Sequence, residues 1–561
     1  MTVVRRARGS ILLFRAVGLL LLAALWSAVP GVLPASAHAY LLGTTPGDGD
    51  RVDTWPSTVE VRLSEAIGAP SGSEAATVVG ATAGRVDTGT DVDGNRLVIH
   101  LRPDAPQDRY LVSWTAVSTD SHVVSGAIQF GYGVPALATE VPIPATPVWV
   151  PVTSVITRTA VTGGLVLALG LVPGRLVLAG AGRRLPRGPA RAAAVGVGLV
   201  VAGSLVQLGA QLAAQTGSQW RAGLADFLTG GYAAWTAVRL GGIAAAVAGW
   251  LLARRGGAVP RRGWALFAAA GALTAVVAVA HAGHGAQSIA LLVSTSAHIA
   301  GAVAWAGGLV VLAAAVLRRR VDAGALAGLR RWSRYAVVAV GVVVVSGVWP
   351  ALVGLGFPGA LVQTSWGRVL VLKLALVAAA LALALAGSRW VAAQNRTPAA
   401  DGGAVPGRTA ALRRRTEAEV GLLAGVVLAA AVLGSTAPGN ATYRPTARAE
   451  APVGPYRVEA ALTPARTGPA TVAVRLEPQG ANRIPEEVDA VIRTDDGTIG
   501  PLPVEITSSA SEPAGPGEVP VVIYHSATVD LPRPGQWRLD VTVRVSEVEQ
   551  YVGGASLRIE G

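Results

Sequence analysis

The stretch AVVAVAHAGHGAQSIALLVSTSAHIAGAVAWAGGL, Ala275–Leu309, decides how most of this chain folds. It holds two apolar runs separated by a short polar connection at 284–288. A run of about 20 apolar residues is long enough to cross a lipid bilayer as a helix. Because the connection is so short, the two helices must be antiparallel neighbours. The stretch also carries three of the chain's seven histidines: His281, His284 and His298.

Apolar runs of this kind continue on both sides of the stretch, and about eight fall within residues 152–436. They lie at 154–180, 192–213, 233–253, 264–283, 289–317, 334–355, 366–387 and 418–436. Of the 561 residues, 51% are hydrophobic and only 14% are charged. This composition, together with the long apolar runs, predicts a multi-pass membrane protein.

The placement of positive charge predicts how the chain is oriented. The net charge of +13 is typical of a nucleic-acid-binding protein, but the arginines gather in alternate loops between the apolar runs. The positive loops are 182–191, 254–262, 318–331 and 388–416, whereas 214–232, 284–288 and 356–365 carry almost no positive charge. Cytoplasmic loops are enriched in Lys and Arg. We therefore expect both ends of the chain to be extracytoplasmic, with a lipid bilayer and no nucleic acid as partner.

Short segments with alternating apolar residues lie before and after the membrane region, and such a period of two indicates β-strands. The apolar faces are Val59, Val61 and Leu63; Leu97, Ile99 and Leu101; Tyr110, Val112, Trp114 and Ala116; and Trp537, Leu539, Val541 and Val543. The predicted fold class is mixed. It comprises an all-β, Ig-like sandwich at 38–133, a linker at 134–151, an eight-helix transmembrane bundle at 152–436 and a C-terminal β-sandwich at 440–561.

The first residues predict a signal peptide at 1–37. Arginines within the first eight residues precede the apolar run 16–29, and the small-x-small pattern Ala35–Ala37 follows. Cleavage there makes His38 the new N-terminus. An uncleaved membrane anchor is one alternative. A second is cleavage after Ala39, because 37–39 is also small-x-small, and the chain would then begin at Tyr40 and lack His38.

Two further residues complete a possible metal site with His38. Asp120 and His122 are two positions apart after an expected strand, so in extended backbone their side chains point the same way. A free N-terminal His38 offers both its amine and its ring nitrogen to one ion. The chain has no Cys and its only Met is the initiator, so soft sulfur ligands are excluded. Three nitrogens and one carboxylate oxygen suit tetragonal Cu(II).

Residues 38–133 resemble the CopC-type copper-binding proteins of copper-resistance systems. The resemblance rests on HAYLLGTTPGDGDRV, VEVRLSEAI and VSWTAVSTDSHVVSGAIQF. It implies a CopC-like β-sandwich that binds Cu(II) through His38, Asp120 and His122. Glu65 matches a carboxylate that lies near copper in some members, although Leu63 stands here where those members have Phe.

The three membrane histidines form a second possible metal site. His281 and His284 are three residues apart and share one helix face, and the charge-derived topology places both at the outer end of their run. His298 falls in the outer half of the next run, so the three imidazoles can converge. Ionisable groups within a membrane usually face a cavity or a partner. Lys373, in the seventh run, is an unexpected cation beside a path for metal ions.

The membrane region resembles the CopD-type copper transport proteins through AHAGHGA, AHIAGAVAWAGGL, RWSRYAVVAVGVVVVSG and SWGRVLVLKLALV. The resemblance implies copper movement across the cytoplasmic membrane, generally inward, and makes His281, His284 and His298 the candidate transmembrane copper ligands. We therefore expect a protein of copper homeostasis or resistance that is not an enzyme, and no nucleotide-binding P-loop motif is present. A membrane-anchored copper sensor or scaffold without transport, and a copper-dependent oxidase using the N-terminal His site, are the alternatives.

Overall fold

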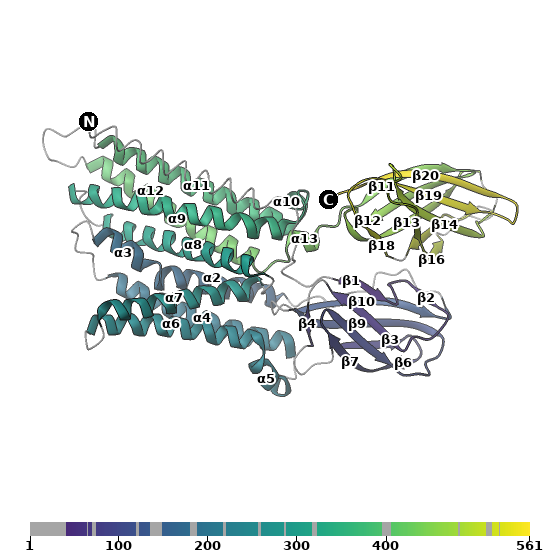
Figure 1. The fold of residues 1–561 in the computed structure, drawn as a ribbon, viewed down its shortest axis with the longest axis horizontal. Coiled ribbons are helices and arrows are strands. Elements are labelled where there is room, and N and C mark those ends of the chain that lie inside the picture. Colours follow the sequence, from purple (N-terminus) through teal and green to yellow (C-terminus); the bar gives the residue numbers. More distant parts are fainter. Residues whose placement is uncertain are drawn as a thin grey trace. The chain divides into compact units, whose positions relative to one another are not determined.

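A computed structural model describes most of the chain outside its N-terminal segment. The described residues are 41–63, 66–69, 75–118, 123–134, 148–179, 188–216, 220–255, 260–284, 288–316, 323–394, 406–480, 483–511, 519–526 and 528–561. Contacts divide the chain into a helical unit, Pro147–Asn440, and a unit that holds the two β-rich segments, Ala39–Thr146 and Ala441–Gly561 (Figure 1).

The N-terminal β segment is a sandwich of two sheets. The first sheet has the order β1 (Leu41–Thr45), β3 (Thr58–Leu63), β8 (Arg96–Leu101) and β7 (Asp87–Asp93). The second has the order β2 (Arg51–Val52), β10 (Val123–Tyr132), β9 (Asp108–Ser118), β5 (Ala76–Gly80) and β6 (Gly84–Arg85), and β4 (Ile67–Gly68) pairs with β9. The predicted apolar faces of β3, β8 and β9 all lie in the buried core between the sheets.

The C-terminal β segment is a second sandwich. One sheet has the order β11 (Ala447–Val453), β12 (Tyr456–Thr463), β13 (Gly468–Pro478), β17 (Val522–Ser526) and β16 (Ile506–Ser511), and β18 (Val529–Leu531) pairs with β13. The other has the order β15 (Leu502–Val504), β14 (Glu487–Thr494), β19 (Gly535–Arg544) and β20 (Gln550–Ile559). Trp537 of β19 is fully buried at the centre of the core, as its place in the alternating pattern predicts.

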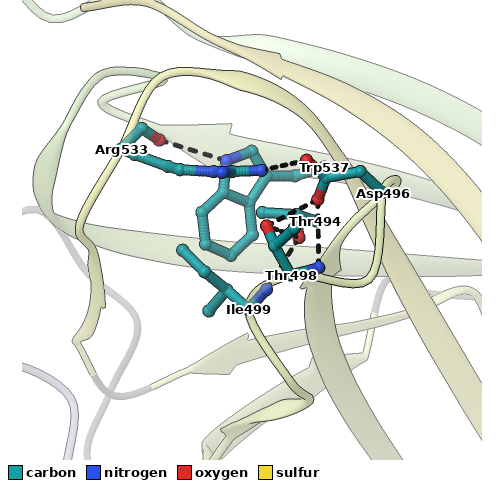
Figure 2. A network of polar contacts seen from close by, with 6 residues as sticks. All are labelled: Thr494, Asp496, Thr498, Ile499, Arg533 and Trp537. Atoms are coloured by element: carbon teal, nitrogen blue, oxygen red, sulfur yellow. Dashed lines mark hydrogen bonds and ion pairs between the residues drawn. The ribbon is translucent and has the colours of Figure 1, made fainter.

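A polar network closes one end of this second sandwich (Figure 2). Asp496 accepts hydrogen bonds from the backbone N–H and the hydroxyl of Thr498, and it forms an ion pair with Arg533. Hydrogen bonds from Thr494, Thr498 and Arg533 lower the pKa of Asp496. The indole N–H of Trp537 donates to the Arg533 carbonyl at 3.2 Å, so the network ties the turn to the core.

The start and the end of the C-terminal sandwich are joined by one buried hydrogen bond. The Tyr443 hydroxyl donates to Oε2 of Glu560 at 2.7 Å, and the Tyr443 ring is fully buried. Burial and this hydrogen bond raise the pKa of Tyr443 to about 12. The bond fastens the segment that enters the sandwich to the segment that follows its last strand.

The helical unit contains eight helices long and apolar enough to cross a membrane within the ranges the structure describes. Its long helices are α2 (Trp149–Ala168), α4 (Gly188–Thr216), α6 (Gly231–Arg255), α7 (Arg261–His284), α8 (Ile289–Val316), α9 (Ala323–Leu355), α11 (Ser365–Gln394) and α12 (Pro406–Leu433). Shorter ones are α3 (Leu171–Ala179), α5 (Trp220–Thr229), α10 (Ala360–Gln363) and α13 (Gly439–Thr442). The order of sandwich, helices and sandwich confirms the predicted fold class.

The first span is broken into α2 and α3. Pro173 has no N–H to donate to the Leu169 carbonyl, and its ring would clash there, which explains the break. At the break α3 meets α8 backbone to backbone: a Cβ on Gly170 would lie 2.1 Å from the Val303 carbonyl oxygen, and one on Gly174 would lie 2.6 Å from the Cα of Gly308. Only glycine permits this approach.

Candidate metal-binding sites

The predicted ligands of the N-terminal site lie outside the described residues. This holds for His38, Glu65, Asp120 and His122. The strands that lead to these positions are described, however, and their pairing shows where each ligand-bearing segment departs from the sandwich.

The described strand ends that flank these positions in the sequence are paired with one another. Leu41, three residues after His38, pairs with Leu63, two residues before Glu65. Ile67, two residues after Glu65, pairs with Ser118, two residues before Asp120. The segments that carry the four predicted ligands therefore leave the sheets from neighbouring backbone positions.

A tight turn at 94–95 fixes the end of β3 and the start of β4. The Leu63 N–H donates to the Asn95 carbonyl and the Ile67 N–H to the Gly94 carbonyl, each at 2.9 Å. The Asn95 side-chain amide donates back to the Leu63 carbonyl at 2.7 Å. Gly94 has a φ of 61°, a conformation that favours glycine. The backbone on both sides of Glu65 is thus held by hydrogen bonds.

A different carboxylate of this sandwich, Asp108, is committed to structural hydrogen bonds. Its Oδ2 accepts from the Thr82 N–H at 2.6 Å and from the Ala83 N–H at 2.9 Å, and its Oδ1 accepts from the Arg109 N–H at 2.8 Å. Burial alone would raise the pKa of Asp108, but these hydrogen bonds prevail and the pKa is lowered. Asp108 therefore stabilises a turn.

His100 lies on the solvent-facing side of β8, as the alternation predicts. Its Nε2 is 2.8 Å from Oδ2 of Asp91 on the neighbouring strand β7, and both side chains are exposed. The sequence pattern did not indicate this partner. An exposed pair of this kind contributes little to stability, and we assign it no functional role.

His298 is held by α9. Its Nδ1 is 2.8 Å from the Val343 carbonyl oxygen. A carbonyl oxygen only accepts, so Nδ1 carries the proton and Nε2 keeps its lone pair. A Cβ on Gly347 would lie 2.7 Å from both Cε1 and Nδ1 of His298, so glycine leaves room for the ring. Metal-binding histidines usually donate their other N–H in this way.

Two more hydrogen bonds between side chain and backbone hold α8 against α9. The Ser294 hydroxyl donates to the Ser346 carbonyl at 2.6 Å, and the Tyr335 hydroxyl donates to the Ala304 carbonyl at 3.0 Å. Together with the His298 contact they fix the register of the two helices. Lys373 of α11 lies close enough to His298 to interact with it electrostatically.

His281 has a different neighbour. Its ring stacks on Trp235 of α6, with ring centroids 3.9 Å apart and an interplanar angle of 29°. Its Nδ1 is buried and has no hydrogen-bond partner among the residues that the structure describes. The side chain of His284 lies outside the described part of the chain. Within the described ranges, no three side chains of His, Cys, Asp or Glu gather closely enough to hold one metal ion.

Arg239 is a buried cation that sequence reasoning missed. It lies on α6 and is only 3% exposed. Its hydrogen bond to the Thr236 hydroxyl is weak, because its Nη2 lies 3.5 Å from that oxygen. Arg158 of α2 and Tyr232 of α6 lie within electrostatic reach. An Arg inside an apolar run is the signal that identifies such a residue.

These features define a multi-pass membrane protein with a β-sandwich before and after its helices. Residues 41–133 match the CopC domain family, and residues 326–433 match the family of Copper resistance protein D, CopD. The chain therefore carries a CopC domain followed by a CopD domain, which confirms the resemblance stated from the sequence.

Two known proteins are similar to parts of the chain. The copper transport protein CutJ of Bacillus subtilis is 33% identical over 101 residues, which are 17% of this chain and 18% of CutJ. The match thus spans less than a fifth of that relative. The crystal structure of CopC from Methylosinus trichosporium OB3b is 21% identical, and the match covers 17% of this chain and 93% of that one with a TM-score of 0.16.

Proposed function

We propose that this chain captures Cu(II) outside the cytoplasmic membrane and moves copper across the membrane, inward, in copper homeostasis or resistance. The observation that carries the proposal is the presence of a CopC domain and a CopD domain in one chain. The similarity of part of the chain to the copper transport protein CutJ supports the same function.

Capture would take place at the end of the N-terminal sandwich. In the proposed site His38 supplies its free amine and its imidazole, and Asp120 and His122 supply one oxygen and one nitrogen, with Glu65 nearby. The pairing of Leu41 with Leu63 and of Ile67 with Ser118 supports this set, because these described residues flank the proposed ligands in the sequence. The amine must lose its proton before it binds copper, which costs little near neutral pH.

Entry into the membrane would use the histidines of α7 and α8. The fixed tautomer of His298 supports its role, because Nε2 is the nitrogen left to bind a cation. His281 and His284 would hold the ion nearer the outer surface. Arginine-rich loops mark the cytoplasmic side. These histidines would therefore lie in the outer half of the membrane, and both sandwiches would be extracytoplasmic.

The function is tested with the full chain in liposomes that enclose a copper-sensitive dye. We expect copper added outside to enter the liposomes. Gly347→Ala should lower the rate about 10-fold or more, because the new methyl group displaces His298. Gly241→Ala on α6 is the matched control, since a Cβ there meets nothing within 4 Å.

Three results would contradict this proposal. Copper binding without entry into the liposomes favours a membrane-anchored copper sensor or scaffold that does not transport. Copper-dependent oxidation of an added substrate favours the oxidase. Equal rates for both glycine variants remove His298 from the path.

A further inference from the structure

Glu419 is a carboxyl placed inside the helical unit. It lies on α12 within the span Arg414–Leu433, and it is 9% exposed. Within the described part of the helical unit it is the only acidic residue that is buried. Ionisable residues inside a membrane are costly, and they usually serve a substrate or ion pathway.

The packing of α12 points this carboxyl inward. Thr416 and Leu423, one turn before and one turn after Glu419, are also buried. Leu423 belongs to the central apolar cluster of the unit, together with Leu165 of α2 and Trp305 of α8. Glu417, two residues earlier, is exposed on another face of the same helix. One glutamate therefore faces the interior and its near neighbour faces the surroundings.

No hydrogen bond or ion pair to Glu419 is found among the described residues. An ionised carboxylate without a partner is strongly disfavoured in an apolar interior. The group must therefore take up a proton or a cation when it is in use. The chain has no Cys, so a carboxylate is, apart from tyrosine, the only anionic ligand type that it can offer to a metal ion inside the membrane.

Glu419 and His298 lie toward opposite ends of the bundle. Glu419 is five residues from Arg414, roughly 8 Å along the helix, at the end that follows the arginine-rich loop 388–416. His298 is nine residues, roughly 14 Å, from Ile289 at the opposite side of the membrane. The histidines therefore lie in one half of the membrane. In the other half, Glu419 is the one described acidic residue that is buried.

We propose that Glu419 forms a cation-binding site in the cytoplasmic half of the bundle. It receives the copper ion through its carboxylate oxygens after the ion leaves the histidines. This role rests on the proposed transport function. The site binds the same metal cation that is transported. The carboxylate provides the negative charge that the imidazoles lack.

The test compares Glu419→Gln with Glu417→Gln in the full chain. Both variants remove one carboxylate from α12, but only the first changes the interior. In liposomes we expect Glu419→Gln to lower copper entry at least 10-fold, Glu419→Asp to keep an intermediate rate and Glu417→Gln to match the unchanged chain. The Cu(II) spectrum of the N-terminal domain should be the same in all three, and the intermediate rate of Glu419→Asp reports that the helical unit still folds.

A second measurement separates this inference from the proposed function. Asp120→Ala with His122→Ala weakens the outer site, and metal analysis at low copper concentration then reports mainly the copper retained by the helical unit. We expect retention to fall when Glu419→Gln is added and to stay constant with Glu417→Gln. Absence of copper entry with the unchanged chain would overturn the transport function. Lower copper retention in Glu419→Gln than in Glu417→Gln would still support the cation-binding site at Glu419.

Two results overturn the inference itself. One is equal retention and equal copper entry for the two glutamine variants. The other is a Glu419→Gln chain that transports copper at the normal rate but loses the pH dependence of transport, since this assigns the carboxyl to proton transfer.

Discussion

The two β-sandwiches share an architecture but use their polar residues differently. In the C-terminal sandwich, Asp496 and Arg533 bond to each other and close a turn over Trp537. In the N-terminal sandwich, the paired strands lead instead toward Asp120, His122 and the other predicted copper ligands. The comparison teaches that a sandwich is a scaffold, and that the residues beyond its strand ends decide whether it binds a metal ion.

The largest expected difference between the sandwiches is in copper binding. Asp120→Ala with His122→Ala should weaken Cu(II) binding by about 100-fold or more, because two of the proposed ligands are lost. His525→Ala, on β17 of the C-terminal sandwich, should leave binding unchanged. Electron paramagnetic resonance and competition titration of the full chain measure both. If His525→Ala removes the copper signal, the two sandwiches have been assigned the wrong roles.

The two sandwiches should also lose stability at opposite ends of the pH scale. The lowered pKa of Asp108 means that its contribution is present above the unfolded pKa, about 3.9, and is lost as the pH falls through the folded value. Asp108→Asn should cost about 1.5–3 kcal/mol at neutral pH, since three backbone donors lose an ionised acceptor. Hydrogen exchange of 75–118 in the full chain reports the effect. Equal protection of Asp108→Asn and the unchanged chain at pH 7 would contradict it.

Tyr443 is the residue through which the C-terminal sandwich should lose stability at alkaline pH. Its raised pKa means that its contribution is fully present below the unfolded pKa, about 10, and is lost as the pH rises toward the folded value of about 12. Tyr443→Phe should cost about 1 kcal/mol and remove this alkaline loss, because the bond to Glu560 no longer exists. Exchange of 447–463 between pH 9 and pH 11.5 checks the result, and exchange of the N-terminal sandwich is the internal control.

The smallest effect concerns the central tryptophans. The Trp537 indole N–H donates to the Arg533 carbonyl, whereas the buried N–H of Trp114 has no partner in the described part of its sandwich. Both changes to Phe reduce packing, but only Trp537→Phe also breaks a hydrogen bond, so it should cost about 1 kcal/mol more than Trp114→Phe. Denaturant midpoints of the two sandwiches, followed by hydrogen exchange, measure the difference. Equal costs would mean that the indole bond contributes nothing to the C-terminal sandwich.

Patterns that depend on burial could be predicted from the sequence. Val59, Val61 and Leu63 lie in the core because alternate burial on a strand requires apolar residues at a period of two. The eight spans also lie within five residues of the predicted runs, since a bilayer demands long apolar segments.

Contacts made by the backbone could not be predicted in this way. The Val343 carbonyl that fixes His298 leaves no mark in the sequence, because every residue has a carbonyl. The break after α2 depends on Pro173 and on the close approach of α8, and only the proline was visible. Glu419 could have been found, because an acidic residue stands at the edge of an apolar run. The positions of His38, Asp120 and His122 remain predictions.

The contact between α3 and α8 has a mechanical consequence. Where two backbones touch through glycines, no side chain can change rotamer to let one helix slide along the other. The two helices must then move together as one rigid body. Larger motions are left to helices such as α11, because only 11% of its most apolar window is buried inside the unit.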